Sequence, residues 1–412
     1  MDNSLGNTCV YDAKMNGEEF VGIRIEDDAP RVYFPLGYRQ PTSEKEQKRD
    51  ILNLISVLST YCPKTESPQT EHDKKSTSFP IHAYIGVFTY YLNHGYFTES
   101  NAIYKRGQFG KIDWNQTIKK IQPHVSKKFP VYLDYVVKKN QTNEDNLITQ
   151  IHKFCVYESY QKLGRLFSSA KPENPSIKLN VPLFSSVLLS KITNTFNEKH
   201  LVLFHQMLDI IQSLGKNRKQ KKLFYGTTEF EYVWENLIDH VYGVSKKKKL
   251  EFYPRTQWSL DNGGDFEVDT EHEKSPLRPD TIMICPKNDK ERIFVLDAKY
   301  YRFGISANPI SLPGSGSINK QFTYAEYVET LEKYKGADIY NAFIMPYKAN
   351  LPEGKIDLAP QKIGFATGNW KISGKTYEKI YGILLDVKSI MYQHSRLSTK
   401  DMEKLAELIE NS

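Results

Sequence analysis

Short apolar runs with the length of β-strands alternate with segments of helical periodicity at the start of the chain. Strand-like runs lie at 20–25 and 32–37, and residues 49–61 place apolar side chains at helical spacing. The following segment, 62–79, is polar and contains prolines, so we interpret it as an exposed loop or linker. We therefore expect a small α+β module over residues 1–79.

Aromatic-rich segments of helical periodicity dominate the middle of the chain. They lie at 82–97, 143–167 and 197–214. We therefore expect residues 80–222 to form a mainly helical region that binds DNA or a partner protein.

Basic and aromatic residues alternate at 104–125, between the first two of these segments. Such interleaving suits a surface that contacts phosphates and stacks on bases, which makes Lys105, Arg106 and Lys111 candidate DNA contacts. The alternative is that Trp114 is packed and that a helix begins beside it, with its N-cap at Asp113 or Asn115.

The last stretch, residues 223–412, combines both patterns. An amphipathic helix is predicted at 228–243 and another within 317–335. Strand-like runs follow one another at 281–285, 293–296, 340–347, 362–368 and 381–387. This order predicts an α+β or α/β fold whose C-terminal domain is a mixed sheet flanked by helices.

Acidic residues stand at the ends of the two central runs. The runs at 281–285 and 293–296 are separated by a polar turn, which predicts a β-hairpin. Asp280 precedes the first strand, Asp297 ends the second, and Lys299 follows two residues later. Because buried charges are costly unless they are paired or hold a metal, this hairpin is a candidate site.

Hydrolysis of a phosphodiester suits this set of side chains. Mg²⁺ takes oxygen ligands, and Asp280, Asp297 and the main-chain carbonyl of Ala298 could supply three of them. Lys299 lies on the same strand face as Asp297, where an ammonium could orient water or offset negative charge. Ala298 then faces the packed side of the sheet.

A third carboxylate that completes the metal site is expected from the helix at 228–243. Glu231 and Glu235 are four residues apart and share one face of it, although either could simply coat an exposed surface. We favour Glu235, because it follows Trp234, which we expect to pack on the sheet.

Composition sets broad limits on the class of protein. The 412 residues are 39% hydrophobic and 13% aromatic, and no apolar segment approaches the roughly 20 residues that span a bilayer. With no recognisable signal peptide, we expect a cytoplasmic protein that does not enter membranes. The four cysteines form no CxxC pair, so we expect them to be reduced. The net charge of +7 includes basic runs at 216–222 and 246–249, which favours a polyanionic partner.

The motif residues resemble a known nuclease superfamily. RPD at 278–280 followed by LDAK at 296–299 resembles the PD-(D/E)XK motif of restriction-endonuclease-like nucleases. KQFTY at 320–324 resembles the helix of RecB-like nucleases and McrC-type subunits, in which Gln321 and Tyr324 would border the active site. The order VWENLIDHVYG, PRTQW, RPD, LDAKYY and KQFTY is most similar to the LlaJI family of restriction endonucleases.

This resemblance implies a prokaryotic, type II-like restriction enzyme that cuts double-stranded DNA with Mg²⁺, for which Mn²⁺ would substitute. It implies catalytic roles for Asp280, Asp297, Lys299, Glu235 and Gln321, and DNA contacts at Arg278, Lys320 and Tyr324.

The resemblance also implies partners: an AAA+ GTPase of the McrB type, a cognate methyltransferase and, as a further option, a second copy of the chain. No GxxxxGK[ST] segment occurs, and the glycine-containing segment at 312–319 is expected to be a mobile loop. NTP hydrolysis would therefore belong to another chain. Two alternatives stay open: a repair or recombination nuclease of the same fold, and a non-catalytic DNA-binding or assembly subunit in which the acids only form ion pairs.

Overall fold

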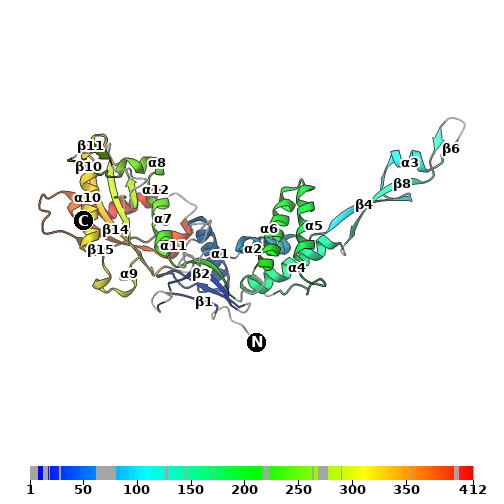
Figure 1. Ribbon diagram of the computed structural model, residues 1–412, viewed down its shortest axis with the longest axis horizontal. Helices are drawn as coiled ribbons and strands as arrows, with labels where there is room; N and C mark the ends of the chain where they lie inside the picture. Colours follow the sequence, from blue (N-terminus) through cyan, green and yellow to red (C-terminus); the bar gives the residue numbers. More distant parts are fainter. Residues whose placement is uncertain are drawn as a thin grey trace. The chain divides into compact units, whose positions relative to one another are not determined.

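The computed structural model describes residues 8–12, 17, 19–26, 29–61, 80–125, 129–143, 146–168, 170–216, 222–261, 264–267, 277–288, 290–352, 354–393 and 399–411. The chain forms two compact units (Figure 1). The first contains the described residues of 1–25, 31–78 and 224–412, and the second those of 26–30 and 79–223. The expected segments 1–79 and 223–412 thus lie largely in one unit. The expected linker at 62–79 and most of the basic run at 216–222 lie outside the described residues.

A five-stranded mixed sheet is the centre of the first unit. Its strands are β12 (Thr281–Ile284), β13 (Arg292–Ala298), β14 (Asp338–Tyr347), β15 (Gln361–Ala366) and β16 (Ile380–Asp386). They lie in the order β12-β13-β14-β16-β15. β13, β14 and β16 are parallel, whereas β12 and β15 are antiparallel edges. The mixed sheet and the β12–β13 hairpin expected from the sequence are confirmed.

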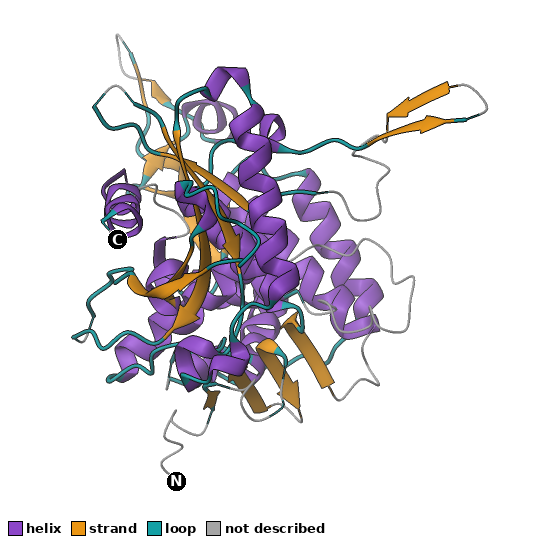
Figure 2. Cartoon of the chain, turned by 90° about the vertical axis from the view of Figure 1, so that its left-hand side faces the viewer, coloured by secondary structure: helices purple, strands orange, loops and turns teal. Residues whose placement is uncertain are grey.

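Two helices cover opposite faces of this sheet next to β13 (Figures 1 and 2). Helix α10 (Ser315–Thr330) packs on the face that carries Ile293 and Val295. Helix α7 (Phe230–Tyr242) contacts the other face, where the indole Nε1 of Trp234 donates a hydrogen bond to the Ile344 carbonyl of β14 at 3.3 Å. The prediction of a mobile loop at 312–319 is wrong from residue 315 onward, because helix α10 begins at Ser315. There the apolar face of the helix extends back to Ile318, which packs beside the core under α10.

The N-terminal segment builds a second, smaller sheet in the same unit. Strands β1 (Cys9–Val10), β2 (Val21–Glu26), β3 (Ala29–Tyr33) and β9 (Lys222–Thr227) lie in the order β1-β3-β2-β9, and helix α1 (Glu44–Tyr61) follows them. β2 and β9 approach very closely at Gly22 and Gly226. A Cβ on Gly22 would lie 2.2 Å from the Tyr225 carbonyl oxygen, so neither strand tolerates a side chain there.

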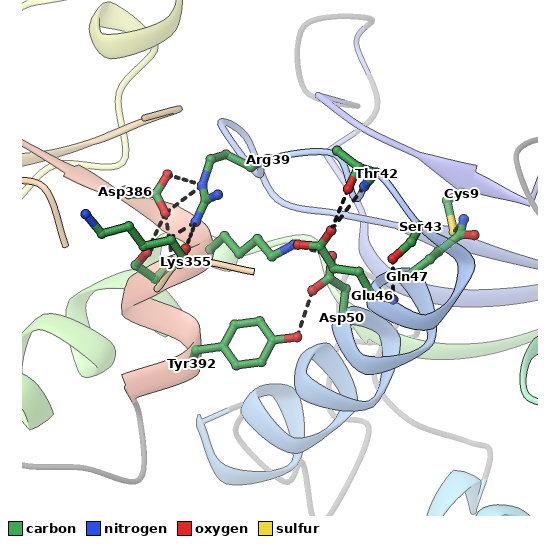
Figure 3. A network of polar contacts seen from close by, with 12 residues as sticks. Cys9, Arg39, Thr42, Ser43, Glu46, Gln47, Asp50, Lys355, Asp386 and Tyr392 are labelled. Carbon is green, nitrogen blue, oxygen red and sulfur yellow. Dashed lines mark hydrogen bonds and ion pairs between the residues drawn. The ribbon is translucent and has the colours of Figure 1, made fainter. Parts of the chain in front are cut away.

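Buried charges join this N-terminal segment to the end of the central sheet (Figure 3). The Arg39 guanidinium pairs with Asp386 at the end of β16 at 3.0 Å. The Lys388 ammonium, in helix α11 (Val387–Gln393), lies 2.7 Å from Asp50 and 2.6 Å from Glu46 on α1. These pairs explain why residues far apart in sequence fold as one unit.

The second unit is helical with one long β-ribbon. Its helices are α2 (Ile81–His94), α3 (Trp114–Lys120), α4 (Leu147–Lys162), α5 (Val181–Thr193) and α6 (Glu198–Lys216). α2 packs against α4 and α6, and α5 packs against α6. The ribbon consists of β4 (Glu99–Gly107) and β8 (Tyr135–Asn143), with β5 (Lys111–Ile112) paired to β8. The sequence pattern did not predict this ribbon, because its polar strands lack an apolar face of period two.

The alternative for residues 104–125 is half right. Asp113 caps α3 by accepting a hydrogen bond from the Gln116 amide at 3.0 Å. Trp114, however, is not buried in a core: it is 53% exposed, and its ring contacts only the edges of Tyr132 and Tyr135 among the described aromatic rings.

The remaining elements include several short strands and helices. They are β6 (His124–Val125), β7 (Pro130–Val131), α8 (Lys246–Lys249), β10 (Gln257–Leu260), β11 (Gly264–Glu267), α9 (Phe303–Ser306) and α12 (Thr399–Glu410). Cys9, Cys155 and Cys285 are buried free thiols, as expected. Cys62 lies outside the described residues. Within the described ranges, every helix is too short or too polar to cross a membrane.

Replacing Lys388 by Met should lower the free energy of unfolding by about 3–5 kcal/mol, because Asp50 is left as an unpaired buried charge. The matched control is Lys48→Met. Its ammonium also lies 2.7 Å from a carboxylate, that of Glu44, but the pair is exposed and should contribute less than about 1 kcal/mol. Urea unfolding measures both, and equal losses would contradict the assignment of stability to the buried network.

His152 should make the stability of the second unit depend on pH. Burial lowers the pKa of His152 to about 3, and its Nδ1 accepts a hydrogen bond from the Phe97 amide at 2.8 Å. An unfolded histidine has a pKa of about 6.5, so the stabilisation is complete above that pH and is lost as the pH falls toward 3.

Between pH 7 and pH 5 the wild type should lose roughly 2 kcal/mol more than His152→Asn, which keeps an acceptor near Nδ1 but does not titrate. Urea unfolding at the two pH values tests this. Parallel losses in both proteins would refute it.

Candidate active site

The register of the β12–β13 hairpin brings two acids together. Thr281 lies opposite Leu296, so Asp280 and Asp297 occupy facing positions just beyond that pair. The Ala298 amide donates a hydrogen bond to Asp280 Oδ2 at 2.9 Å, which turns the Asp280 carboxyl toward β13. Asp280 and Asp297, two of the residues that the sequence predicted as metal ligands, therefore share one end of the hairpin.

Lys299 adds a positive charge at the same end. Its ammonium lies 2.8 Å from Asp297 Oδ2, and both side chains are partly accessible to solvent. The Lys299 amide donates to the Ile344 carbonyl at 2.9 Å, so the main chain remains fixed to β14 beyond the last residue of β13. Ala298 is buried between them. The arrangement is an acid pair with an adjacent, partly open ammonium.

The surroundings of the acid pair disfavour two negative charges. Burial raises the pKa of the Asp280 carboxyl well above its usual range, and the neighbouring Asp297 carboxylate raises it further. Burial alone would lower the pKa of Lys299, but the charges of Asp297 and Asp280 and the hydrogen bond to Asp297 act in the opposite direction, and the pKa of Lys299 is raised overall. The site therefore favours bound positive charge, either a proton on Asp280 or a cation beside it.

Glu235 is the glutamate whose charge acts on this pair. It is half-buried on α7, and burial raises its pKa although nearby Lys299 lowers it. Glu231 instead lines a small pocket with Phe34, Leu36 and Tyr300. The packing of Trp234 expected from the sequence is confirmed, and it fixes the turn of α7 that carries Glu235. The structure therefore favours Glu235 over Glu231.

The donor set fits a hard divalent cation. Two facing carboxylates, with the carbonyl of Ala298 between Asp297 and Lys299, match the oxygen ligands of Mg²⁺, which usually keeps several waters. Among the described residues, no group of three His, Cys, Asp or Glu side chains is placed to hold a metal ion, so Glu235 does not join the acid pair as a third ligand in this arrangement. A cation held here would therefore rely on Asp280 and Asp297, with Glu235 near enough to add charge.

Gln321 and Tyr324 lie on α10 behind the acids rather than at an open surface. The Gln321 side chain is fully buried, and its Nε2 donates to the carbonyls of Ala342 and Val295 at 3.2 and 3.4 Å, which ties β14 to β13. Tyr324 is 6% exposed. Burial, together with Asp280 and Asp297, raises the pKa of Tyr324 to about 12. Because both side chains are buried, Gln321 and Tyr324 are better placed to support the strands than to contact a substrate.

The basic residues predicted to contact DNA are all exposed. Arg278 precedes the hairpin and lies over the Tyr253 ring, and Lys320 lies on α10. Lys105, Arg106 and Lys111 belong to the β-ribbon of the other unit, where Arg106 pairs with Asp134 at 2.8 Å. Their role in binding DNA stays a prediction.

Two residues beside the site were missed. The Tyr300 hydroxyl accepts a hydrogen bond from the Leu36 amide at 2.6 Å, which joins the motif strand to the N-terminal segment. The Lys249 ammonium donates to the Asp280 carbonyl. Tyr300 could have been suspected from its place directly after Lys299. Lys249 is the last of four consecutive lysines, and nothing in the run distinguishes it.

Comparisons with known proteins identify the family of this chain. The model of the LlaJI restriction endonuclease family matches residues 20–357. A curated relative, the type II restriction enzyme BsuMI component YdjA of Bacillus subtilis (strain 168), is 29% identical over 264 residues. That match covers 61% of this chain and 55% of the relative, so the chain spans little more than half of the curated relative's length.

Among solved structures, the chain overlaps with one from a Thermococcus gammatolerans assembly of McrB AAA+ hexamers with bound McrC. The overlap covers 94% of this chain and 83% of that one at 15% identity, and its TM-score of 0.34 is too low to support an argument. The family match, which extends over most of the sequence and includes the hairpin, is decisive: this chain belongs to the LlaJI restriction endonuclease family.

Proposed function

We propose that this chain is a Mg²⁺-dependent endonuclease of a restriction system that hydrolyses phosphodiester bonds in double-stranded DNA. The observation that carries the proposal is the facing pair Asp280 and Asp297 with the Lys299 ammonium 2.8 Å from Asp297. Membership of a restriction endonuclease family supports it.

Each group of the site has a place in the proposed reaction. When bound, Mg²⁺ would supply positive charge that offsets the charge growing on the phosphate, and would make water more acidic. Mn²⁺ would substitute for it. Asp280 and Asp297 would hold the cation, together with the Ala298 carbonyl.

The remaining side chains would act on water and phosphate. Lys299 is partly exposed, so its ammonium could leave Asp297 and face either the attacking water or the scissile phosphate. Glu235, whose pKa is raised by burial, could accept a proton from that water. Gln321 would keep β13 and β14 in register beneath these groups.

The basic residues Arg278 and Lys320 are exposed near the site and would contact the DNA backbone. Lys105, Arg106 and Lys111 would provide further contacts from the second unit, either to DNA or to a partner. Tyr324, which is buried, would contribute by supporting the acids.

A second candidate is that the chain acts only as one component of a larger enzyme. The relative YdjA is described as a component, and the sequence resembles McrC-type subunits, which work with an AAA+ GTPase of the McrB type. Such a GTPase, a cognate methyltransferase and a second copy of this chain are the partners to test. Plasmid cleavage by the chain alone, and then with the products of neighbouring genes, separates the two candidates.

Asp297→Asn should slow plasmid cleavage at least about 100-fold, because a charge that holds the cation is lost where the transition state needs it. DNA binding without metal should change little. Asp338→Asn is the matched control, since Asp338 lies on the same sheet but pairs with the exposed Lys290. Gel-based cleavage with Mg²⁺ is the measurement, and wild-type rates for Asp297→Asn would refute the proposed function.

Lys299→Met should reduce the cleavage rate by roughly 100-fold while Mn²⁺ binding is retained, because the ammonium acts on water or phosphate and is not a ligand. Cleavage rates and titration calorimetry with Mn²⁺ separate the two effects. Lys290→Met is the control. Full activity of Lys299→Met would remove the proposed role of Lys299 and leave the metal site untouched.

A further inference from the structure

Lys249 is a buried lysine that contacts the main chain of Asp280. We propose that Lys249 is the positioning residue of this site: its ammonium connects the end of α7 to the start of β12 and so fixes where the Asp280 carboxyl points. This inference rests on the proposed function, because it assigns a task to Asp280. It gives a purpose to one residue of the basic run at 246–249.

The segment between α7 and α8 runs alongside the hairpin. The Val244 amide donates to the Ile282 carbonyl of β12 at 2.9 Å, which attaches the segment to the edge strand. Ser245 caps α8, and the Lys249 amide donates to the Ser245 carbonyl at 3.0 Å. These bonds place Lys249 next to the entrance of β12.

The ammonium of Lys249 has two partners. It lies 2.9 Å from Asp239 Oδ1 in the last turn of α7, and it donates to the Asp280 carbonyl. Its side chain is only 11% exposed, so the pair is poorly screened by water. The same ammonium attracts the Glu235 carboxylate electrostatically. Lys249 therefore acts on two acids of the proposed reaction, Asp280 through a hydrogen bond and Glu235 through its charge.

Gly243 makes room for this contact. A Cβ on Gly243 would lie 2.5 Å from Asp239 Oδ1 and 2.3 Å from the Asp239 carbonyl oxygen. A larger residue would therefore push the Asp239 carboxylate away from Lys249. Because Gly243 has no side chain, the Asp239 carboxylate can lie close to the main chain at Gly243 and still contact Lys249.

The consequence reaches the acid pair through Asp280. Its carbonyl is held by Lys249 and its carboxyl oxygen by the Ala298 amide, so the residue is fixed at both ends. Without Lys249, the Asp280 main chain would lose its hydrogen bond to the segment after α7, and the carboxyl could turn away from Asp297. Such loosening beside a metal ligand typically reduces metal affinity about 10- to 100-fold.

The other lysines of α8 differ from Lys249. Lys246 and Lys247 are exposed. Lys247→Met is therefore a matched control, because it removes the same charge from the same helix two residues away without touching Asp280.

The experiment compares the full-length wild type, Lys249→Met and Lys247→Met. Titration calorimetry with Mn²⁺ gives metal affinity, and hydrogen exchange of the peptide that contains Ala298 reports, in metal-free protein, whether the Asp280 carboxyl still accepts from its amide. We expect Lys249→Met to weaken Mn²⁺ binding about 10-fold or more and to speed exchange at Ala298. Lys247→Met should match the wild type in both.

Several results would overturn the inference. If the wild type binds Mn²⁺ and cuts DNA with Mg²⁺ but folded Lys249→Met behaves like Lys247→Met, Lys249 has no positioning role. If the wild type itself neither binds Mn²⁺ nor cuts DNA, the proposed function fails instead. Should Lys249→Met not fold, Asp239→Asn tests the same link. We expect it to weaken Mn²⁺ binding several-fold, and unchanged affinity would refute the link.

Discussion

The antiparallel pairing of β12 with β13 is the interaction on which the site depends. It sets Thr281 opposite Leu296 and therefore Asp280 opposite Asp297. Because side chains alternate along a strand, a slip of one residue would exchange the faces of Asp297 and Ala298 and separate Asp297 from Asp280. Hydrogen bonds around the hairpin oppose such a slip: Gln321 holds β13 to β14, Lys299 continues the β14 pairing, and Lys249 fixes the chain before β12.

The site is supported by segments far away in sequence. Tyr300, directly after Lys299, accepts a hydrogen bond from Leu36, and the Arg39–Asp386 and Lys388–Asp50 pairs join the same N-terminal segment to the end of β16. Buried ion pairs add specificity more reliably than stability. Here they specify that the N-terminal segment completes the unit that carries the acids. This explains why most of the described N-terminal residues belong to the same unit as the five-stranded sheet.

This chain belongs to a restriction endonuclease family, and all the groups proposed for hydrolysis lie in one unit. The second unit carries an exposed ribbon with basic and aromatic residues and contributes none of the proposed catalytic groups. Such a division of labour suits an enzyme whose target choice or assembly is handled apart from hydrolysis.

The sequence by itself determined the elements whose periodicity is strong. It predicted the hairpin, α7 and its packed Trp234, and the strands of the mixed sheet, because apolar spacing reports which face of an element is buried. It also singled out Asp280, Asp297 and Lys299, since charges at the ends of apolar strands are unusual.

Only the tertiary structure decided the rest. It favoured Glu235 over Glu231, showed Gln321 and Tyr324 to be buried, separated Lys249 from three similar lysines, and placed the N-terminal segment beside β16. These outcomes depend on contacts between residues distant in sequence, and local spacing carries no record of such contacts.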